Sequence, residues 1–159
     1  MSNAKISAVH KAVMDKNLSN VAKAIESGEG VDSLDRDGRS ALFYAVRDGN
    51  VAIVKELVKY GANVNLRDMG LETPLHFAAR GYQQEVADFL LKSGAIADAQ
   101  DVHGNTPLSR AVFDSRGRGD LIRLLISYGA DKTLKNNRGV SPEGLANTIA
   151  NYDIKSFLN

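Results

Sequence analysis

Apolar residues recur along this chain at the three-to-four-residue spacing of short helices, most clearly after Thr73. Ala78 and Ala79 follow Leu75 by three and four residues, as on a helix that buries one stripe of its surface. Thr73 can cap the free amides of the first turn, and Pro74 occupies a position that needs no backbone donor. The pattern predicts a short helix that begins directly after Thr73.

The same stretch recurs at a fixed interval. Its capping residues are Ser7, Ser40, Thr73, Thr106 and Ser141, so successive copies start 33, 33, 33 and 35 residues apart. All three prolines of the chain directly follow a capping residue. Each copy also has an alanine five residues after the cap, namely Ala12, Ala45, Ala78, Ala111 and Ala146. The chain is therefore built from repeats.

Two further marks define the repeating unit. A second apolar segment ends at Gly28, Gly61, Gly94 or Gly129, where a helix C-terminus needs a residue free to adopt a left-handed conformation. A turn opens the later copies at Asp35, Asp68, Asp101 or Asn136. In the third copy the turn glycine comes one residue early, at Gly70, and Leu71 takes its usual place. We therefore expect a reshaped turn tip in that copy.

These motifs resemble the ankyrin repeat, whose unit of about 33 residues reads D-x-x-G-x-T-P-L-H-x-A-A before a second helix and G-A. The resemblance covers essentially the whole chain. It implies an all-α ankyrin-repeat solenoid of five helix-turn-helix units, with short β-hairpin turns between repeats. The expected single domain, 1–159, divides at about residues 5–34, 35–67, 68–100, 101–135 and 136–159.

Some copies depart from this pattern. The first lacks the opening turn, and the last ends soon after Ile154, Phe157 and Leu158, as terminal repeats usually do. Phe43 and Ser109 replace the histidine of copies two and four. Copy four has two extra residues between its helices. A tolerated loop insertion is favoured there over a binding loop that carries Arg116 and Arg118.

Composition narrows the possible functions. The net charge of +1 gives no basic excess for nucleic acid, and the absence of cysteine excludes disulfides and thiolate chemistry. No apolar run reaches the roughly 18 residues of a membrane span. The N-terminus has no apolar signal core, so cytoplasmic residence is expected by default. Ser2-Asn3-Ala4 is also compatible with a cloning remnant, in which case a removed signal peptide would leave no trace.

No group of residues indicates catalysis, a cofactor or a metal. His10 and His76 share one repeat position, where the family resemblance implies a bond to the capping hydroxyl, and His103 falls on a turn tip. A metal site needs three ligands within a few ångströms, whereas His10 and His76 lie two repeats apart in the sequence. The glycine-rich segment 115–120 lacks the spacing of a phosphate-binding loop, and its Arg-Gly-Asp tripeptide is interpreted as coincidental. We expect a protein that is not an enzyme.

The resemblance implies instead a surface for a protein partner, because ankyrin partners usually meet the hairpin tips and the concave face of the first helices. Mapped by repeat position, the predicted partner-binding residues are Arg36, Asp37, Arg39, Tyr44, Arg47, Asp48, Met69, Glu72, Phe77, Arg80, Val102, His103, Asn105, Arg110, Phe113, Asp114, Arg116, Arg118 and Arg138. Arginine is frequent at these positions, whereas the second helices carry lysine, which interfaces disfavour.

Tyr44, Phe77 and Phe113 have two alternative interpretations. They are either apolar anchors for the partner or covers for the grooves between repeats, with arginines stacked upon them. Because acidic residues lie among the arginines, the surface is mixed in sign. It suits a protein partner with a mixed-charge to acidic surface better than a polyanion.

The sequence therefore predicts a non-enzymatic module that is a monomer when unbound and binds a folded protein, with no nucleic acid and no membrane. Small ankyrin chains of this kind resemble bacterial immunity proteins that neutralise a toxin, which is the most concrete hypothesis. An adaptor or scaffold with several partners is equally compatible with the residues. A nucleic-acid-associated regulator is a less favoured alternative.

Overall fold

The computed structural model describes residues 6–149 and 153–158. These residues form nine α-helices and one 3-10 helix: α1 (Ala8–Met14), α2 (Leu18–Glu26), α3 (Ala41–Arg47), α4 (Val51–Lys59), α5 (Pro74–Arg80), α6 (Gln84–Lys92), α7 (Pro107–Phe113), α8 (Asp120–Ser127), α9 (Pro142–Thr148) and η1 (Lys155–Leu158). The triplet Ser2-Asn3-Ala4 and the outer ends of the first and last repeats lie outside the described residues.

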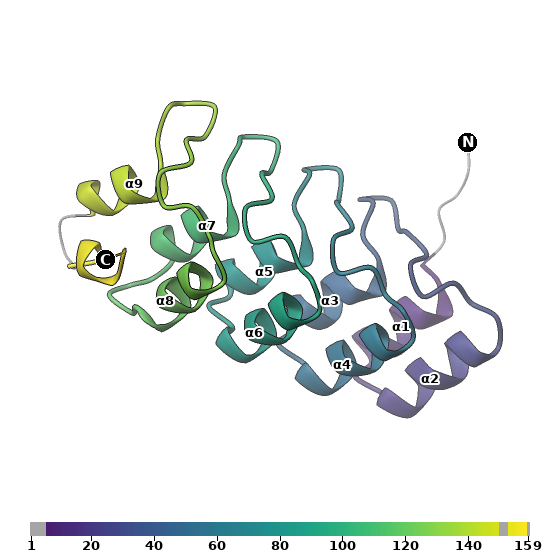
Figure 1. Ribbon diagram of the computed structural model, residues 1–159. Helices are drawn as coiled ribbons and strands as arrows, with labels where there is room; N and C mark the ends of the chain where they lie inside the picture. The colour runs from purple at the N-terminus through teal and green to yellow at the C-terminus, as the bar shows by residue number, and fades with distance from the viewer. Residues whose placement is uncertain (1–5, 150–152, 159) are drawn as a thin grey trace.

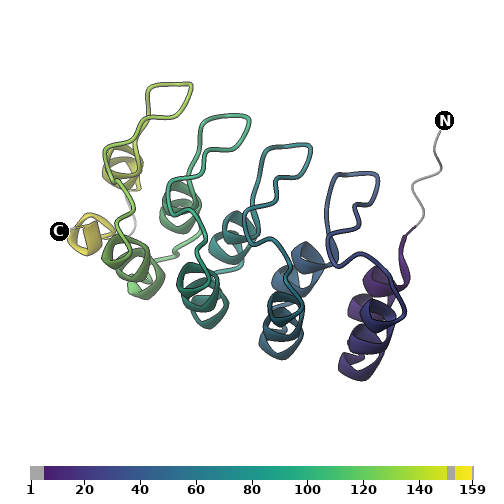
Figure 2. The ribbon, with the colours of Figure 1, turned by 45° about the vertical axis from the view of Figure 1, so that its right-hand side comes forward.

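The helices are stacked as antiparallel pairs in one row (Figure 1). The first helices α1, α3, α5, α7 and α9 contact one another in order, and α2, α4, α6 and α8 form a second layer. Figure 2 shows that the loops between pairs all project to the same side. The predicted all-α solenoid is confirmed. The turns between repeats are hairpin-shaped loops in which the described residues include no strand.

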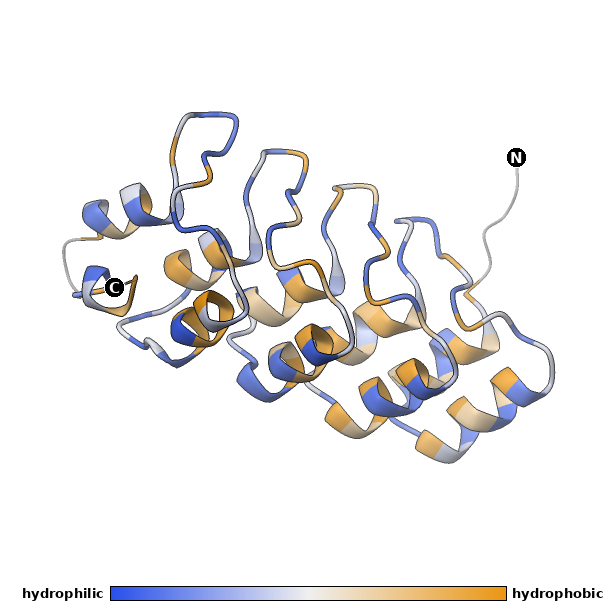
Figure 3. Ribbon diagram, in the orientation of Figure 1, coloured by the Kyte–Doolittle hydropathy of each residue, from blue (hydrophilic) through white to orange (hydrophobic). Residues whose placement is uncertain are grey.

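Small and branched apolar residues hold the stack together. The alanine five residues after each cap is at most 5 % exposed, which allows neighbouring first helices to approach closely. Leu42, Leu75 and Leu108 occupy one repeat position and are fully buried beside these alanines. Figure 3 shows apolar residues on the facing sides of the helices. Each repeat packs its two helices together and completes its core against its neighbours.

Most of the predicted caps are present. Ser7, Thr106 and Ser141 each accept a hydrogen bond from the backbone N–H three residues later. The Thr73 hydroxyl instead contacts His76 Nδ1, and the buried Ser40 hydroxyl has no hydrogen-bond partner among the described residues. The repeat carries Phe43 where the histidine of repeats one and three would reach back to the cap.

The turn of repeat three corrects one expectation. Its closing bond, from Asp68 N to Glu72 O at 3.0 Å, matches that from Asp35 N to Arg39 O at 2.9 Å. The predicted reshaping is therefore wrong. Leu71 itself adopts the left-handed conformation, with φ of 57°, that glycine adopts in the other turns. A side chain in this conformation costs about 1 to 2 kcal/mol.

Backbone hydrogen bonds join the turn tips of neighbouring repeats. Met69 N donates to Asp37 O at 2.9 Å, and Val102 N donates to Gly70 O at the same distance. Asn137 N then donates to His103 O at 3.0 Å. The four tips consequently form one continuous edge of the molecule.

The two-residue insertion of repeat four contacts repeat three on one side and η1 on the other. The Arg118 guanidinium lies 3.9 Å from the centre of the Tyr82 ring, and the Tyr82 hydroxyl donates to the backbone carbonyl of Arg118. On the other side Gly119 faces Phe157, and a Cβ at Gly119 would come within 2.4 Å of that ring. Arg116 is exposed. The loop thus connects repeat three with η1.

Candidate functional site

The histidines at the shared repeat position hold the stack together. His76 Nδ1 lies 2.9 Å from the hydroxyl of its cap, Thr73, and its Nε2 lies 3.0 Å from the carbonyl oxygen of Asn105 in the next repeat. His10 makes the equivalent contacts to Ser7 and Arg39. This geometry matches the cap contact that the family resemblance implied, and each ring also bridges two repeats.

Phe77 is covered by two arginines of the predicted binding set. The guanidinium carbons of Arg39 and Arg80 lie 5.1 and 5.3 Å from the centre of its ring, and the residue is only 8 % exposed. Arg39 also donates through Nε to the buried carboxylate of Asp68 at 3.0 Å. These contacts place Phe77 and both arginines in the packing between repeats.

Tyr44 is covered in a similar way. Arg47 lies 4.9 Å from the centre of its ring and also pairs with Asp48 at 3.2 Å. The Tyr44 hydroxyl donates a hydrogen bond to Asp35. Burial and this hydrogen bond raise the pKa of Tyr44 to about 12, so the hydroxyl remains protonated. Of the three predicted aromatic anchors, only Phe113 remains uncovered.

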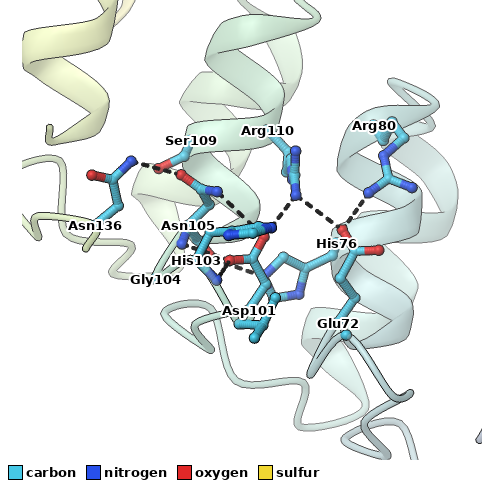
Figure 4. A network of polar contacts seen from close by, with 12 residues as sticks. Glu72, His76, Arg80, Asp101, His103, Gly104, Asn105, Ser109, Arg110 and Asn136 are labelled. Carbon is cyan, nitrogen blue, oxygen red and sulfur yellow. Dashed lines mark hydrogen bonds and ion pairs between the residues drawn. The ribbon is translucent and has the colours of Figure 1, made fainter. Parts of the chain in front are cut away.

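A chain of ion pairs continues from repeat three into repeat four (Figure 4). Arg80 and Arg110 both contact Glu72 Oε1, the latter at 3.2 Å. Arg110 also contacts Asp101 Oδ2 at 2.6 Å. Glu72 therefore shares its charge between two arginines from different repeats. We call Arg39, Asp68, Glu72, Phe77, Arg80, Asp101 and Arg110 the covered patch.

The pKa values of Asp101, in the covered patch, and of His76, beside it, are both lowered. Burial lowers the pKa of His76 to about 4, so the ring is neutral and acts as a structural hydrogen-bonding group. Burial alone would raise the pKa of Asp101. Hydrogen bonds from the backbone N–H groups of Asn105 and His103 outweigh that effect, with a further contribution from Arg110, and the pKa is lowered. Asp101 is thus a charged acceptor at the base of the turn.

Other residues of the predicted partner-binding set are largely exposed to solvent. Met69 is 77 % exposed on its turn tip, Val102 is 51 % exposed on the next, and Phe113 is 68 % exposed at the end of α7. Val140 continues the exposed apolar row onto the tip of repeat five. The exposed Arg138 side chain makes no hydrogen bond or ion pair with any described residue. We call Met69, Val102, Phe113, Arg138 and Val140 the open set.

A polar hollow lies between the tips of repeats four and five. It has a volume of about 270 Å³ and is lined by His103, Asn105, Asn136, Asn137 and Arg138. Asn137 Nδ2 donates to Val102 O at 3.1 Å, and Asn136 Nδ2 donates to Asn105 Oδ1 at 2.8 Å. These contacts fix the relative position of the two tips that form the hollow.

The remaining predicted residues lie at the two ends of the face. Arg36 and Asp37 are on the first tip, beside an open groove that Lys11, Met14 and Tyr44 also line. Asp114 ends α7, next to the insertion that carries Arg116 and Arg118. The structure thus distributes the predicted set over the turn tips, the first helices and the insertion, and does not gather it into one pocket.

Sequence reasoning missed several residues that organise this face. Asp68 and Asp101 were identified only as turn residues, yet they bind Arg39 and Arg110. Arg39 directly precedes the cap Ser40, whereas Arg110 follows the cap Thr106 by four residues, so the two pairs share no repeat position and no single sequence signal identifies both. Nothing in the local sequence indicates the contact between the insertion and Phe157.

The described residues hold no group of three or more histidine, aspartate or glutamate side chains placed to bind a metal ion. Within the same part of the chain, none of the helices has both the length and the apolar character needed to cross a bilayer.

Comparison with known families identifies the class of protein. A family model described as ankyrin repeats in three copies matches residues 2–68 and again residues 67–136. Because these matches cover well over half of the sequence, the chain belongs to the ankyrin-repeat family. Members of this family are generally non-enzymatic, and their repeats serve as protein–protein interaction modules. No curated protein matches the chain.

Proposed function

We propose that this chain binds a folded protein partner through its concave face and hairpin tips, without catalysis. The observation that carries the proposal is the exposure of large apolar side chains at predicted partner-facing positions, above all Met69 and Phe113. Exposed apolar surface of this kind marks interaction sites when it is gathered on one face. The backbone bonds between tips align Met69 with Val102 and the residues that follow.

The opposite helix layer has a different chemistry. Its exposed side chains form charged pairs, such as Lys55 with Glu85 at 3.7 Å and Lys92 with Asp88 at 2.6 Å. Lysine and glutamate are depleted at interfaces and are typical of a solvated surface. Some large apolar residues are exposed on or beside this layer, but they occupy different repeat positions and form no row: Leu18, Leu34, Ile96 and Tyr128. The contrast favours the face of the turn tips.

Site-specific photocrosslinking tests the choice of face. A benzophenone amino acid is placed at position 69 or 113 and, as a control, at Lys59 or Lys23 on the second helices. In lysate of the native host, we expect one discrete adduct from the first two positions and none from the controls. Adducts that form equally from all four positions would contradict the proposal.

The identity of the captured protein then distinguishes between an immunity protein and a scaffold. A stable one-to-one complex with a toxin, together with loss of the toxin's activity, would support an immunity role. Several unrelated adducts would support a scaffold. Salt-dependent retention of the purified chain on DNA or RNA in place of protein capture would favour the nucleic-acid alternative.

A further inference from the structure

We propose that the hollow between the tips of repeats four and five binds a carboxylate side chain of the protein partner, with aliphatic groups of the same partner segment against Val102 and Val140. This inference rests on the proposed function and specifies the chemistry of the partner. The hollow is lined by His103, Asn105, Asn136, Asn137 and Arg138, and none of these carries a negative charge.

The charge of Arg138 distinguishes the hollow from the places on the face where Arg39, Arg47, Arg80 and Arg110 lie. Arg39, Arg47, Arg80 and Arg110 each lie within 3.4 Å of a carboxylate in the same chain. The guanidinium of Arg138 makes no such pair with the residues that the structure describes. A partner carboxylate at Arg138 therefore gains a charge-assisted contact, whereas one at the other four would compete with a carboxylate already bound.

Asp101 is a carboxylate on the same turn as His103, but it is not available to neutralise Arg138. It is buried, and its oxygens accept from the N–H groups of His103 and Asn105 and from Arg110. The hollow thus retains a positive guanidinium, the exposed ring of His103 and the amide of Asn137 at its surface.

The hollow is also preorganised. The bonds from Asn137 N to His103 O and from Asn137 Nδ2 to Val102 O join the two tips directly. Because the tips are already fixed, a ligand need not order them on binding. Val102 and Val140 are exposed on those tips and provide the apolar contacts beside the hollow. A short segment with an acidic residue between two aliphatic residues fits this arrangement.

Nuclear magnetic resonance titration with blocked tripeptides tests the inference without requiring the partner. The probe is acetyl-Val-Glu-Val-amide, and its matched control is acetyl-Val-Gln-Val-amide. We expect saturable shifts of the His103, Asn137 and Arg138 amides with the glutamate peptide, and affinity at least about tenfold weaker with the glutamine peptide. Equal affinity for both peptides, or no saturable shift up to about 20 mM, would overturn the inference.

Matched variants locate the binding. Arg138→Gln should remove the shifts, Arg138→Lys should retain part of the affinity, and Lys23→Gln on α2 should change nothing despite the same loss of charge. Glutamate-dependent shifts that survive in Arg138→Gln would contradict the assignment. Inorganic phosphate that binds the hollow more tightly than the glutamate peptide would also contradict it, because the site would then select a phosphate.

The outcomes separate this inference from the proposed function. Crosslinks at positions 69 and 113 without peptide binding at the hollow would remove the inference and leave the proposed function. Peptide binding at the hollow with adducts equally from all four crosslinking positions would support the hollow and overturn the wider choice of face.

Discussion

Phe77 and Phe113 lie on first helices of neighbouring repeats, on the same predicted face, yet they have opposite surroundings. Phe77 is 8 % exposed beneath Arg39 and Arg80, whereas Phe113 is 68 % exposed. The covered patch pairs its charges within the chain, although the buried Nε of Arg110 has no hydrogen-bond partner among the described residues. The open set leaves apolar surface and a guanidinium to be met from outside.

This difference shows that arginine frequency alone does not distinguish packing from binding. Arg39 and Arg80 stack on an aromatic ring and pair with carboxylates, so they stabilise the contact between repeats. Arg138 has neither kind of contact among the described residues. The environment of each side chain, rather than its type, decides between the two roles.

The largest expected effect comes from truncating the two phenylalanines. Phe77→Ala should lower the free energy of unfolding by about 4 kcal/mol, because it leaves a cavity and removes the ring beneath two arginines. Phe113→Ala should change the same quantity by no more than about 0.5 kcal/mol. Urea denaturation of both variants measures the difference. Equal losses of stability would mean that Phe113 is packed as firmly as Phe77.

Removing a buried carboxylate should have the next largest effect. Asp101→Ala leaves two turn amides without their acceptor and leaves Arg110 with Glu72 as its only carboxylate, so we expect a loss of about 3 kcal/mol in the free energy of unfolding. Asp37→Ala provides the control, since Asp37 also pairs with an arginine but is largely exposed. Its loss should stay below about 1 kcal/mol. A larger loss from Asp37 than from Asp101 would reverse the account of the covered patch.

Acidification should also weaken the contact between repeats that His76 makes beside the covered patch. The pKa of His76 is about 4 in the folded protein and about 6.5 in an unfolded chain, so the unfolded state binds the proton more strongly. The contribution of neutral His76 is complete above pH 6.5 and is lost as the pH falls towards 4, by about 2 to 3 kcal/mol.

Urea denaturation at several pH values, with wild type and His76→Ser, isolates this contribution. The serine variant copies Ser109 at the equivalent position of repeat four and has no imidazole to titrate. Its stability should fall less than that of wild type between pH 6.5 and 4. Parallel pH profiles would show that His76 is already accessible to protons in the folded state.

The smallest expected effect is a gain in stability at the open edge. Leu71→Gly should raise the free energy of unfolding by about 1 kcal/mol, because glycine adopts the left-handed conformation without the steric cost. Thermal unfolding of this variant and of Gly38→Ala measures the effect. Gly38→Ala is the opposite substitution, since it adds a side chain at a left-handed turn residue, and it should lower the melting temperature. A loss in Leu71→Gly would indicate that the leucine side chain packs despite its exposure.

The sequence was sufficient to predict the repeat unit, because caps, alanines and glycine stops are local requirements that return at a fixed interval. The helix after Thr73 and the left-handed Gly28, Gly61, Gly94 and Gly129 are where that pattern placed them. The contact of His76 with its cap likewise followed from the family resemblance. Each of these features depends on residues within one repeat.

The contacts between repeats were not predictable in the same way. Arg110 meets Glu72 across 38 positions, and Gly119 meets Phe157 only because the helix pairs are stacked. Leu71 shows a local limit, since the bonds of the turn and its neighbouring tips hold a side chain in a conformation that its own preference disfavours. The assignment of partner-binding residues stays a prediction for the same reason, because it depends on a surface outside this chain.

The central claim is that the open set, and not the arginines of the covered patch, provides the binding energy for the partner. Isothermal titration of the crosslinked partner, once purified, against Met69→Ser/Val102→Ser/Phe113→Ser tests this claim most directly. We predict an affinity at least about thirtyfold weaker than wild type, with the urea midpoint unchanged. An affinity within about twofold of wild type would contradict the claim.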